Sequence, residues 1–352
     1  MQYTGDLKIV TKSPYRVEMI QSRGIIAQGA KLSQTKLRAM TAGFLFGGKP
    51  ISLYGFRLIS QEAPIWINGE KYPNKLKIFK DAYGKITVVH EMDLEEYLTG
   101  VLPNEIWANW PDEVLKAQAV ASRTYALYES LIRFGRDYSS SGDVRSQIFR
   151  VNGQEAPSIN EAVETTKGEV LTYKGEIFPT YFHSHSGGRT TRPEYVWPVK
   201  PHPALKGVLS PFARNSKHYR WEAKLESKEI EKRLKNKGYV VGTLSEIIPI
   251  RIDESGRARE IFIRHSRGTL KIRGNNFRMA VGPDKIKSLK DLKIERQGGQ
   301  FVFQGYGWGH GVGMSQWGAR DLADRGFSYR RILRFYYPRT EIVTLKDIVE
   351  QT

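Results

Sequence analysis

The stretch GVLPNEIWANWPDEVLKAQAVASRTYALY, residues 100–128, decides the fold of this chain. Its first part predicts a loop, because Pro103 interrupts regular structure just before Glu105. A helix is predicted to follow, since Asn109 suits the N-cap position and Pro111 suits the first turn. The stretch therefore predicts a carboxylate on a loop that leads into a long central helix.

Small residues dominate the body of this helix, so neighbouring backbone can pack closely against it. They are Ala117, Ala119, Ala121, Ser122 and Ala126. Polar Gln118 and Arg123 lie in the same run, where a purely structural helix more often carries leucine. Arg123 can bind an acidic group of a substrate or pair internally with a carboxylate, and internal pairing is favoured.

Short apolar runs separated by Gly, Ser and Lys fill residues 1–90 and predict antiparallel strands, with a hairpin turn at Asn68-Gly69. A short helix is expected at 92–98, a helix at 159–166, and further strands over 246–281. We therefore expect an α+β fold: a long central helix and shorter helices packed on antiparallel β-sheet, with an N-terminal β-rich extension. The expected division is 1–90 and 91–345, with an inserted strand and helix segment at about 205–300.

Two later stretches of the chain contain further candidate functional residues. They are YFHSHSGGRTTRPEYVW at residues 181–197 and GYGWGHGVGMSQWGARDLADRG at residues 305–326. Together with residues 100–128 they resemble the SpoIID/LytB family, the stage II sporulation protein D group of peptidoglycan lytic transglycosylases. The resemblance covers roughly residues 60–345. It implies that 91–345 is a catalytic core and leaves residues 1–60 without an assignment.

The composition of the chain excludes several kinds of protein and of functional site. The chain has 352 residues, of which 40% are hydrophobic, and no apolar run approaches the roughly 20 residues that a membrane-spanning helix requires. Cysteine is absent, which excludes disulfides, thiolate catalysis and zinc sites built on Cys. The N-terminus lacks the apolar core of a signal peptide. We interpret it as starting after a removed export signal.

The net charge of +18 indicates attraction to an anionic partner. Nucleic acid and the acidic polymers of a bacterial wall are both candidates. Lys and Arg are spread along the chain, and no nucleic-acid-binding module is recognisable. The family resemblance favours peptidoglycan glycan strands as the partner and an exported, periplasmic or wall-associated location, and no nucleic acid is expected.

Glu105 is the candidate catalytic residue. A carboxyl group beside apolar walls, here Ile106, Trp107 and Trp110, has its charged form disfavoured, and this suits a general acid. Trp107 can also stack on a sugar ring. From the residues alone, a simple contact of Glu105 with backbone at a helix start is the favoured interpretation. The resemblance implies the catalytic role, although the family usually carries Met-Pro after this Glu.

A glycosidase ordinarily uses two carboxylates. The resemblance implies a reaction that uses one: Glu105 protonates the leaving oxygen of the MurNAc–GlcNAc β-1,4 bond and then takes the proton of the muramic acid's own 6-hydroxyl. The product is a 1,6-anhydroMurNAc end. The resemblance also implies a preference for glycan from which an amidase has removed the stem peptides. The competing hypothesis is a non-catalytic glycan-binding module that recruits or enhances a cell-wall amidase.

The second stretch contains His183 and His185, which would face the same side of a strand. Two His are too few for a closed metal site, so we expect no metal. The family pattern of His and Ser-Gly-Gly is matched by His183 and Ser186, and it implies a polar loop in which His183, Ser186 and Arg189 contact substrate. These side chains can instead brace the loop.

The third stretch places a glycine at every odd position from 305 to 313. Read as an extended segment, it predicts one bare face and one face that carries Trp308 and His310. His310 is a candidate proton carrier or sugar contact, or else a buried, hydrogen-bonded His. A helix is expected from about 314 to Gly326, and Gln316 at its start is a further candidate for substrate binding.

Gln147 completes the candidate substrate-binding residues, because the family commonly has a Gln before an aromatic residue in this region. The resemblance implies that some relatives hold a metal there with Cys and His. Residues 134–149 contain neither, so no metal is carried over, and no cofactor is expected.

Overall fold

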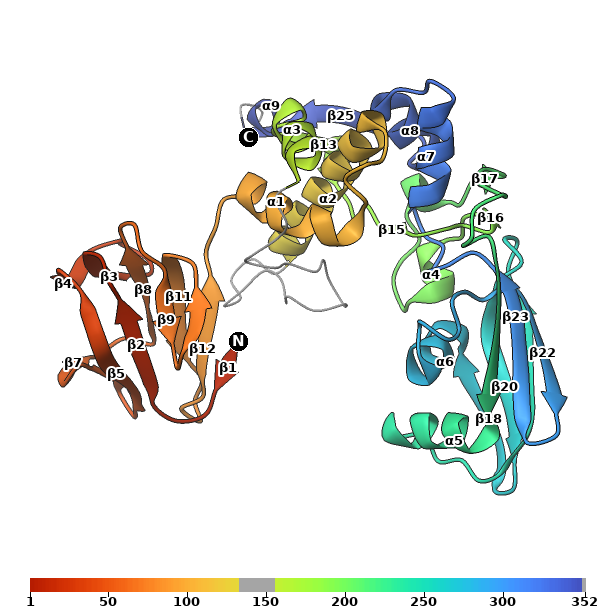
Figure 1. Ribbon diagram of the computed structural model, residues 1–352, viewed down its shortest axis with the longest axis horizontal. Coiled ribbons are helices and arrows are strands. Elements are labelled where there is room, and N and C mark those ends of the chain that lie inside the picture. The colour runs from red at the N-terminus through yellow and green to blue at the C-terminus, as the bar shows by residue number, and fades with distance from the viewer. Residues whose placement is uncertain (133–155, 350–352) are drawn as a thin grey trace. The chain divides into compact units, whose positions relative to one another are not determined.

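The computed structural model describes residues 1–132 and 156–349, and they form two compact units (Figure 1). The N-terminal unit holds residues 1–101 and, of the residues described, also 130–132. The C-terminal unit holds residues 102–129 and residues from 156 onward. Each unit is described by itself. In the described ranges no helix is both long enough and apolar enough to cross a membrane.

The N-terminal unit consists of two six-stranded antiparallel sheets. The first sheet has the order β1 (Gln2–Tyr3), β12 (Ile86–His90), β11 (Lys75–Lys80), β8 (Gly55–Ser60), β3 (Tyr15–Met19) and β4 (Ile25–Gly29). The second has the order β10 (Glu70–Tyr72), β9 (Ile65–Ile67), β2 (Leu7–Thr11), β5 (Leu32–Met40), β6 (Gly43–Phe46) and β7 (Lys49–Ile51). The β-rich N-terminal region was therefore predicted correctly.

One apolar core joins the two sheets. Leu7 and Ile9 of β2 belong to the same buried cluster as Val17 of β3 and Phe56 of β8. Alternate residues of β2 are buried, as expected for strands with one face on a core. This buried cluster makes the unit a β-sandwich.

The predicted turn at Asn68-Gly69 is confirmed. Ile67 pairs with Glu70, and both turn residues have positive φ, 52° and 86°. This is the backbone of a type I′ hairpin, which Asn-Gly adopts readily.

Helix α1 (Leu94–Glu105) is longer than expected. The sequence predicted a helix only to residue 98 and a loop at Pro103, and that prediction is wrong. Pro103 lies in the last turn, where its missing N–H removes one bond, to the carbonyl four residues earlier. The following helical hydrogen bond, from the Ile106 N–H to the Leu102 carbonyl at 3.0 Å, is formed. Glu105 is consequently the last residue of a helix.

The central helix is confirmed as α2 (Asp112–Ile132). The Pro111 carbonyl accepts bonds from the N–H groups of Val114 and Leu115, so Pro111 stands just before the helix. This is a shift of about two residues from the predicted start. Its middle is buried from Ala117 to Thr124, which agrees with the small side chains found there.

Short elements follow the central helix. Helix α3 (Pro157–Thr165) was predicted correctly, and β13 (Glu169–Tyr173) pairs with β14 (Glu176–Ile177) and with β25 (Glu341–Thr344). The remaining short elements are β15 (Phe182–His183), β16 (Gly188–Arg189), α4 (Pro193–Val196), a 3-10 turn (Pro203–Leu205) and β17 (Leu209–Ser210).

The inserted segment has its own apolar core, which includes Ile230, Phe277 and Phe303. Its sheets have the orders β18-β23-β22 and β19-β20-β21, and two helices lie on one side of these strands (Figure 1). The strands are β18 (Arg220–Glu226), β19 (Leu244–Ile252), β20 (Ala258–His265), β21 (Gly268–Arg273), β22 (Lys290–Gln297) and β23 (Gln300–Tyr306), and the helices are α5 (Ser227–Asn236) and α6 (Gly274–Val281).

The strand prediction for 246–281 was wrong over its last eight residues, which form α6. Phe277, Ala280 and Val281 are buried at helical spacing. The short apolar run there did not distinguish a strand from a helix.

The C-terminal part runs through β24 (Met314–Ser315), α7 (Gln316–Asp324), α8 (Tyr329–Tyr336) and α9 (Leu345–Val349). Ser315 caps α7 by accepting from the Gly318 N–H, and Gly326 with a φ of 81° follows its end, as predicted. Helices on antiparallel sheets confirm the α+β class.

Candidate functional site

Three distant stretches of sequence meet at the end of α1. The Gln316 side-chain amide donates to the Glu105 carbonyl at 2.9 Å and to the Gln118 side-chain oxygen at 3.4 Å. Gln118 in turn donates to the Ser122 hydroxyl. The first residue of α7 thus fixes Glu105 against the buried middle of α2, and the Glu105 side chain is half-buried.

The second stretch joins the third in parallel. β15 pairs with β24, so that His183 lies opposite Ser315. The Ser186 N–H donates to the Ser315 hydroxyl at 3.1 Å, and the Trp317 N–H donates to the Ser184 carbonyl at 3.0 Å. The predicted stretches are therefore brought together, although more than 200 residues separate Glu105 from Gln316.

A tryptophan cluster begins two residues after Glu105. The rings of Trp107 and Trp110 are 5.1 Å apart, and both contact Trp317, at 6.0 and 5.0 Å. His218 stacks on Trp107 and also contacts Trp308 at 4.8 Å. Trp110 is 6% exposed but Trp107 is 51% exposed. Trp107 therefore offers an open aromatic face that the ring of a sugar can cover.

Two cations lie over this tryptophan cluster. Arg320 is 5.3 Å from Trp110 and 5.2 Å from Trp317, and Lys287 is 4.8 Å from Trp308. The sequence reasoning missed both of them and His218. Arg320 was recognisable, because it stands three residues after Trp317 on the same helix face. His218 and Lys287 carry no local signal, since only the tertiary fold brings them to the tryptophans.

His183 and His310 form a neutral pair of imidazoles. Their rings are 5.6 Å apart, and His183 Nδ1 bonds to the Val312 carbonyl at 3.0 Å. Burial lowers the pKa of His183 well below 6.5, and burial lowers the pKa of His310 to about 3. Both rings are consequently uncharged near neutral pH.

These histidines have aromatic neighbours that sequence reasoning did not select. Trp197 is 4.8 Å from His310 and 4.7 Å from Tyr181. Within residues 1–132 and 156–349, no group of three or more His, Asp or Glu side chains is placed to hold a metal ion. Of the two histidines, His183 is buried and His310 is partly exposed.

The loop after β15, residues 184–189, is held by its own polar groups. Ser186 is 1% exposed, and its hydroxyl accepts from the Gly188 N–H at 3.2 Å. His185 Nδ1 accepts from the Gly187 N–H, so Nε2 carries the proton donated to the Ala213 carbonyl. These contacts favour the bracing interpretation for Ser186 and His185.

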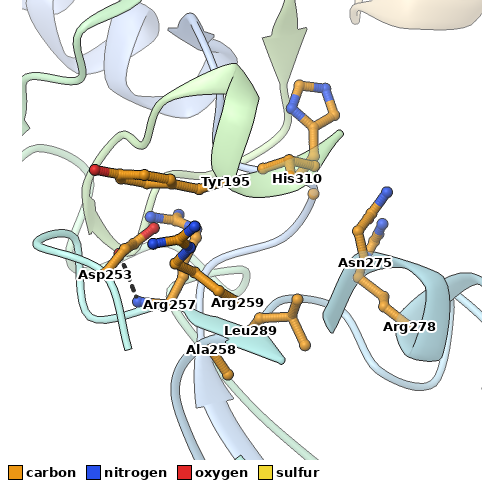
Figure 2. A pocket seen from close by; sticks show the side chains of 11 residues that line it. Tyr195, Asp253, Arg257, Ala258, Arg259, Asn275, Arg278, Leu289 and His310 are labelled. Carbon is orange, nitrogen blue, oxygen red and sulfur yellow. Dashed lines mark hydrogen bonds between the residues drawn. The ribbon is translucent and has the colours of Figure 1, made fainter. Parts of the chain in front are cut away.

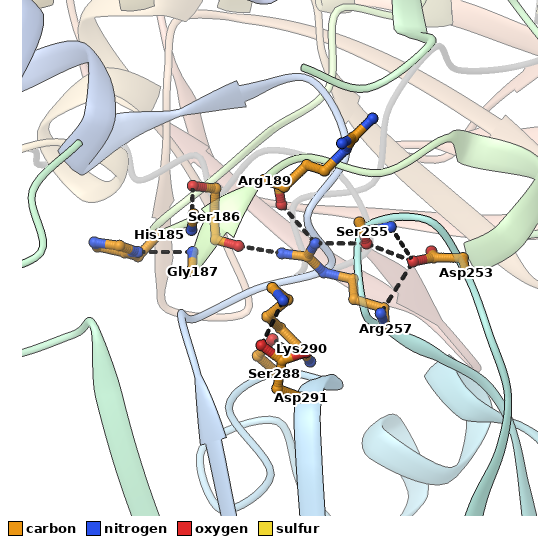
Figure 3. Close-up of polar contacts among 11 residues, drawn as sticks. His185, Ser186, Gly187, Arg189, Asp253, Ser255, Arg257, Ser288, Lys290 and Asp291 are labelled. Carbon is orange, nitrogen blue, oxygen red and sulfur yellow. Dashed lines mark hydrogen bonds and ion pairs between the residues drawn. The ribbon is translucent and has the colours of Figure 1, made fainter. Parts of the chain in front are cut away.

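The Arg257 side chain reaches this loop from the residue just before β20. No local pattern in the sequence predicted the contact. Its guanidinium donates to the carbonyls of Ser186 and Arg189 (Figure 3). The Arg189 carbonyl is thereby occupied, whereas the Arg189 side chain points away from this network in Figure 3.

The glycine-rich segment, residues 305–313, is not extended beyond β23. Gly307, Gly309, Gly311 and Gly313 all have positive φ, from 70° to 112°. The prediction of an extended strand with one bare glycine face is therefore wrong. Alternate residues are glycine because the backbone takes a conformation that L side chains rarely adopt.

Arg123 lies inside the molecule. Its side chain is fully buried and donates to the carbonyls of Glu169 and Val163, at 3.0 and 3.2 Å. These bonds tie α2 to α3 and β13. These bonds support the internal role that was favoured for Arg123. Gln147 lies outside the described residues.

Comparison with known proteins gives a consistent result. A family model described as Stage II sporulation protein matches residues 82–173, and one described as a domain of unknown function (DUF8618) matches residues 161–313. An uncharacterized protein of Brachyspira hyodysenteriae is 36% identical over 281 residues, which cover 79% of this chain and 73% of that protein.

Two Bacillus subtilis proteins are also similar. Stage II sporulation protein D is 30% identical over 269 residues, covering 72% of this chain and 75% of that protein. The amidase enhancer is 26% identical over 297 residues, covering 70% of this chain and 40% of that protein. The chain belongs to the stage II sporulation protein D (SpoIID/LytB) family. This membership supports a cell-wall-related role.

Proposed function

We propose that this protein is a lytic transglycosylase that cleaves the MurNAc–GlcNAc β-1,4 bond of peptidoglycan and leaves 1,6-anhydroMurNAc ends. The observation that carries the proposal is the placement of Glu105. Gln316 holds its backbone, and the exposed Trp107 ring lies two residues away. A carboxyl group next to a sugar-stacking surface is the minimum that such a reaction requires.

In this mechanism Glu105 acts first as an acid and then as a base. It gives its proton to the glycosidic oxygen as the C1–O bond of MurNAc breaks. The resulting carboxylate takes the proton of the 6-hydroxyl, whose oxygen bonds to C1. No water is consumed, so one carboxylate suffices. Among the described residues that link the three stretches, Glu105 is the one that carries a carboxylate.

Trp107, Trp308, His310, Arg189 and Gln147 are proposed to contact the glycan, with Gln316 positioning Glu105. His183, Ser186 and Arg123, which are buried and bonded to backbone, are proposed to support the site. The proposed setting is the cell wall or periplasm. The proposed preference is for glycan that lacks stem peptides.

The alternative is a glycan-binding module that enhances a cell-wall amidase. The relative named amidase enhancer favours it, although this chain covers 40% of that protein. The tryptophan cluster would serve such a module as well as it serves an enzyme.

Digestion and binding of purified wall glycan separate these two functions. Glycan with and without prior amidase treatment is incubated with the wild type, Glu105→Gln and Trp107→Ala, and the released ends are analysed by mass spectrometry. If the protein is the proposed enzyme, the wild type releases anhydro-ended fragments, and Glu105→Gln releases at least about 100-fold less of them while it still binds glycan. Trp107→Ala is expected to weaken binding about tenfold. Binding without cleavage by the wild type would favour the amidase-enhancing module.

A further inference from the structure

The small pocket beside His310 is closed to a further ligand (Figure 2). It has room for about one water molecule. Tyr195 and Arg257 lie on one side of it in Figure 2, and the charge of Arg257 is faced by Asp253 and Asp291. The pocket therefore holds its own charges in balance, and a sugar substituent does not enter it.

The N-terminal β-sandwich carries half of the positive charge of the chain. Residues 1–90 contain fourteen Lys and Arg and five Asp and Glu, a net charge of +9, against +18 for all 352 residues. None of the proposed glycan contacts lies in this part, and the two family models match the chain from residue 82 onward. The excess of charge therefore belongs to a unit whose role the proposed function leaves unexplained.

The second sheet of the sandwich presents an aromatic side chain to solvent. In β9 the side chains of Ile65 and Ile67 are fully buried, whereas Trp66 between them is 38% exposed. Trp66 pairs with Lys71 of β10 on one side and with Val10 of β2 on the other. Residues paired across neighbouring strands point to the same face of a sheet. Trp66 therefore lies between Lys71 and Val10 on the solvent face.

A second lysine lies on the other side of the indole. Lys8 stands two residues before Val10 on β2, and it pairs with Lys36 of β5. Lys8 is thus the diagonal neighbour of Trp66, at about 7–8 Å between the backbones, a distance that a long side chain spans. Lys71 is the direct neighbour, at about 5 Å. The two lysines flank the Trp66 ring from opposite strands.

This face has a net positive charge. Lys8 and Lys71 are exposed, and neither forms an ion pair with a residue in the described ranges. Lys36 and Arg38 share Asp6, at 2.7 and 2.9 Å. Four cations against one carboxylate leave an excess that attracts an anion. We call this set of residues the Trp66 face: Lys8, Val10, Lys36, Arg38, Trp66 and Lys71.

The side chains of the Trp66 face indicate the chemistry of its ligand. The Trp66 indole makes no ring contact with a described residue, so its exposed plane is free to stack on the apolar side of a sugar ring. Lys8 and Lys71 then meet acidic substituents of that sugar. An uncharged glycan would leave the lysines unused, and a polymer without rings would leave the indole unused.

Single-stranded nucleic acid also combines rings with negative charge. Proteins that bind it stack successive bases on several aromatic side chains along a basic groove. The Trp66 face offers one exposed aromatic ring on a sheet, which matches one sugar better than a run of bases. An acidic polysaccharide is therefore the favoured ligand, and nucleic acid serves as the competing ligand in the test.

We propose that the Trp66 face binds acidic glycan strands of the cell wall as a second contact, apart from the site around Glu105. The inference rests on the proposed wall substrate. A sugar ring covers Trp66 while Lys8 and Lys71 pair with carboxylates carried by the strand. Because both units belong to one chain, a long strand bound here has a raised effective concentration at the proposed site. A tetrasaccharide at the proposed site does not use the face.

The test measures binding by the full chain with Glu105→Gln, so that nothing is cleaved. Long glycan strands purified from walls and single-stranded DNA are the two ligands, each sedimented or titrated with the protein. The second substitution is Trp66→Ala, or Lys8→Gln together with Lys71→Gln. The lysine pair keeps the test decisive if loss of the indole disturbs β9.

Each substitution has a matched control in the same unit. Tyr83→Ala controls for Trp66→Ala, because Tyr83 is 97% exposed in the turn between β11 and β12 and lies outside the face. Lys31→Gln with Lys49→Gln controls for the lysine pair, because both are exposed and neither belongs to the face. The controls should bind strands within about twofold of the Glu105→Gln protein.

Trp66→Ala and the lysine pair are each expected to weaken strand binding at least about fivefold. With Glu105 intact, Trp66→Ala should leave cleavage of a muramic-acid-containing tetrasaccharide unchanged. Strand binding that survives Trp66→Ala, or a lysine effect that is equal for strands and DNA, would overturn the proposal. Failure of the transglycosylase would show separately, as a tetrasaccharide left intact by the wild type while strands still bind.

Discussion

Gly313 shows why single residues of the glycine-rich segment matter. It has a φ of 70°, and a Cβ there would overlap the Tyr181 carbonyl oxygen. At Gly311 a Cβ would overlap the Arg257 guanidinium. The alternating glycines were recognisable in the sequence, but their purpose was not. Close approach depends on which distant backbone lies opposite, and this is a tertiary property.

Gly313→Ala is therefore expected to destabilise the C-terminal unit strongly. The strained φ costs about 1–2 kcal/mol, and the overlap with backbone adds about 1–3 kcal/mol. Gly175→Ala is the matched control, since Gly175 has a φ of 79° and nothing within 4 Å of the added Cβ. Urea unfolding should show the larger loss at Gly313. Equal losses at both positions would mean that the overlap relaxes without cost.

At the level of elements, most helices and strands followed from local patterns. The Asn-Gly hairpin, the small-residue central helix and the Ser-capped α7 were each signalled by their own residues. The predictions failed where a local signal was overridden. Helix α1 continues through Pro103, and the last eight residues predicted as strand form α6. In both cases tertiary burial outweighed a weak local preference.

The link between α7 and α1 is the contact on which the site depends most. Gln316→Leu removes the donor to the Glu105 carbonyl and to the Gln118 side chain. The expected loss is about 1–3 kcal/mol of stability, with glycan cleavage lowered more than about tenfold in the folded protein. Gln304→Leu is the control, because Gln304 makes an exposed bond to Glu222. Full cleavage by folded Gln316→Leu would show that Glu105 is placed without this bond.

For the whole molecule, the order of the three stretches predicted the family and the candidate acid. In the structure Gln316 donates to the Glu105 carbonyl, Trp107 contacts Trp317, and His218 contacts both Trp107 and Trp308. The sequence did not single out His218, Lys287 or Arg257. Each comes from the inserted segment or its connections, and only packing brings it to the site.

Acid should weaken the C-terminal unit through His183 and His310. Their folded pKa values lie below the ordinary 6.5, so the unfolded chain binds protons that the folded protein excludes. The contribution of these two imidazoles to the free energy of unfolding is fully present above pH 6.5. It is lost as the pH falls toward the folded pKa, about 3 for His310, by at most about 1.4 kcal/mol per pH unit for each group. His310→Gln should flatten the dependence of unfolding free energy on pH between 6.5 and 5. An unchanged slope would contradict the neutral imidazole pair.

The central claim is that Glu105 cleaves glycan without consuming water. The most direct measurement is digestion of amidase-treated glycan in water enriched in oxygen-18, with mass spectrometry of the new ends, for the wild type and Glu105→Gln. We predict ends that are one water molecule lighter than hydrolysis products and carry no heavy oxygen, and that are lost in Glu105→Gln. Reducing ends that carry heavy oxygen would contradict the claim, because water would then be the nucleophile.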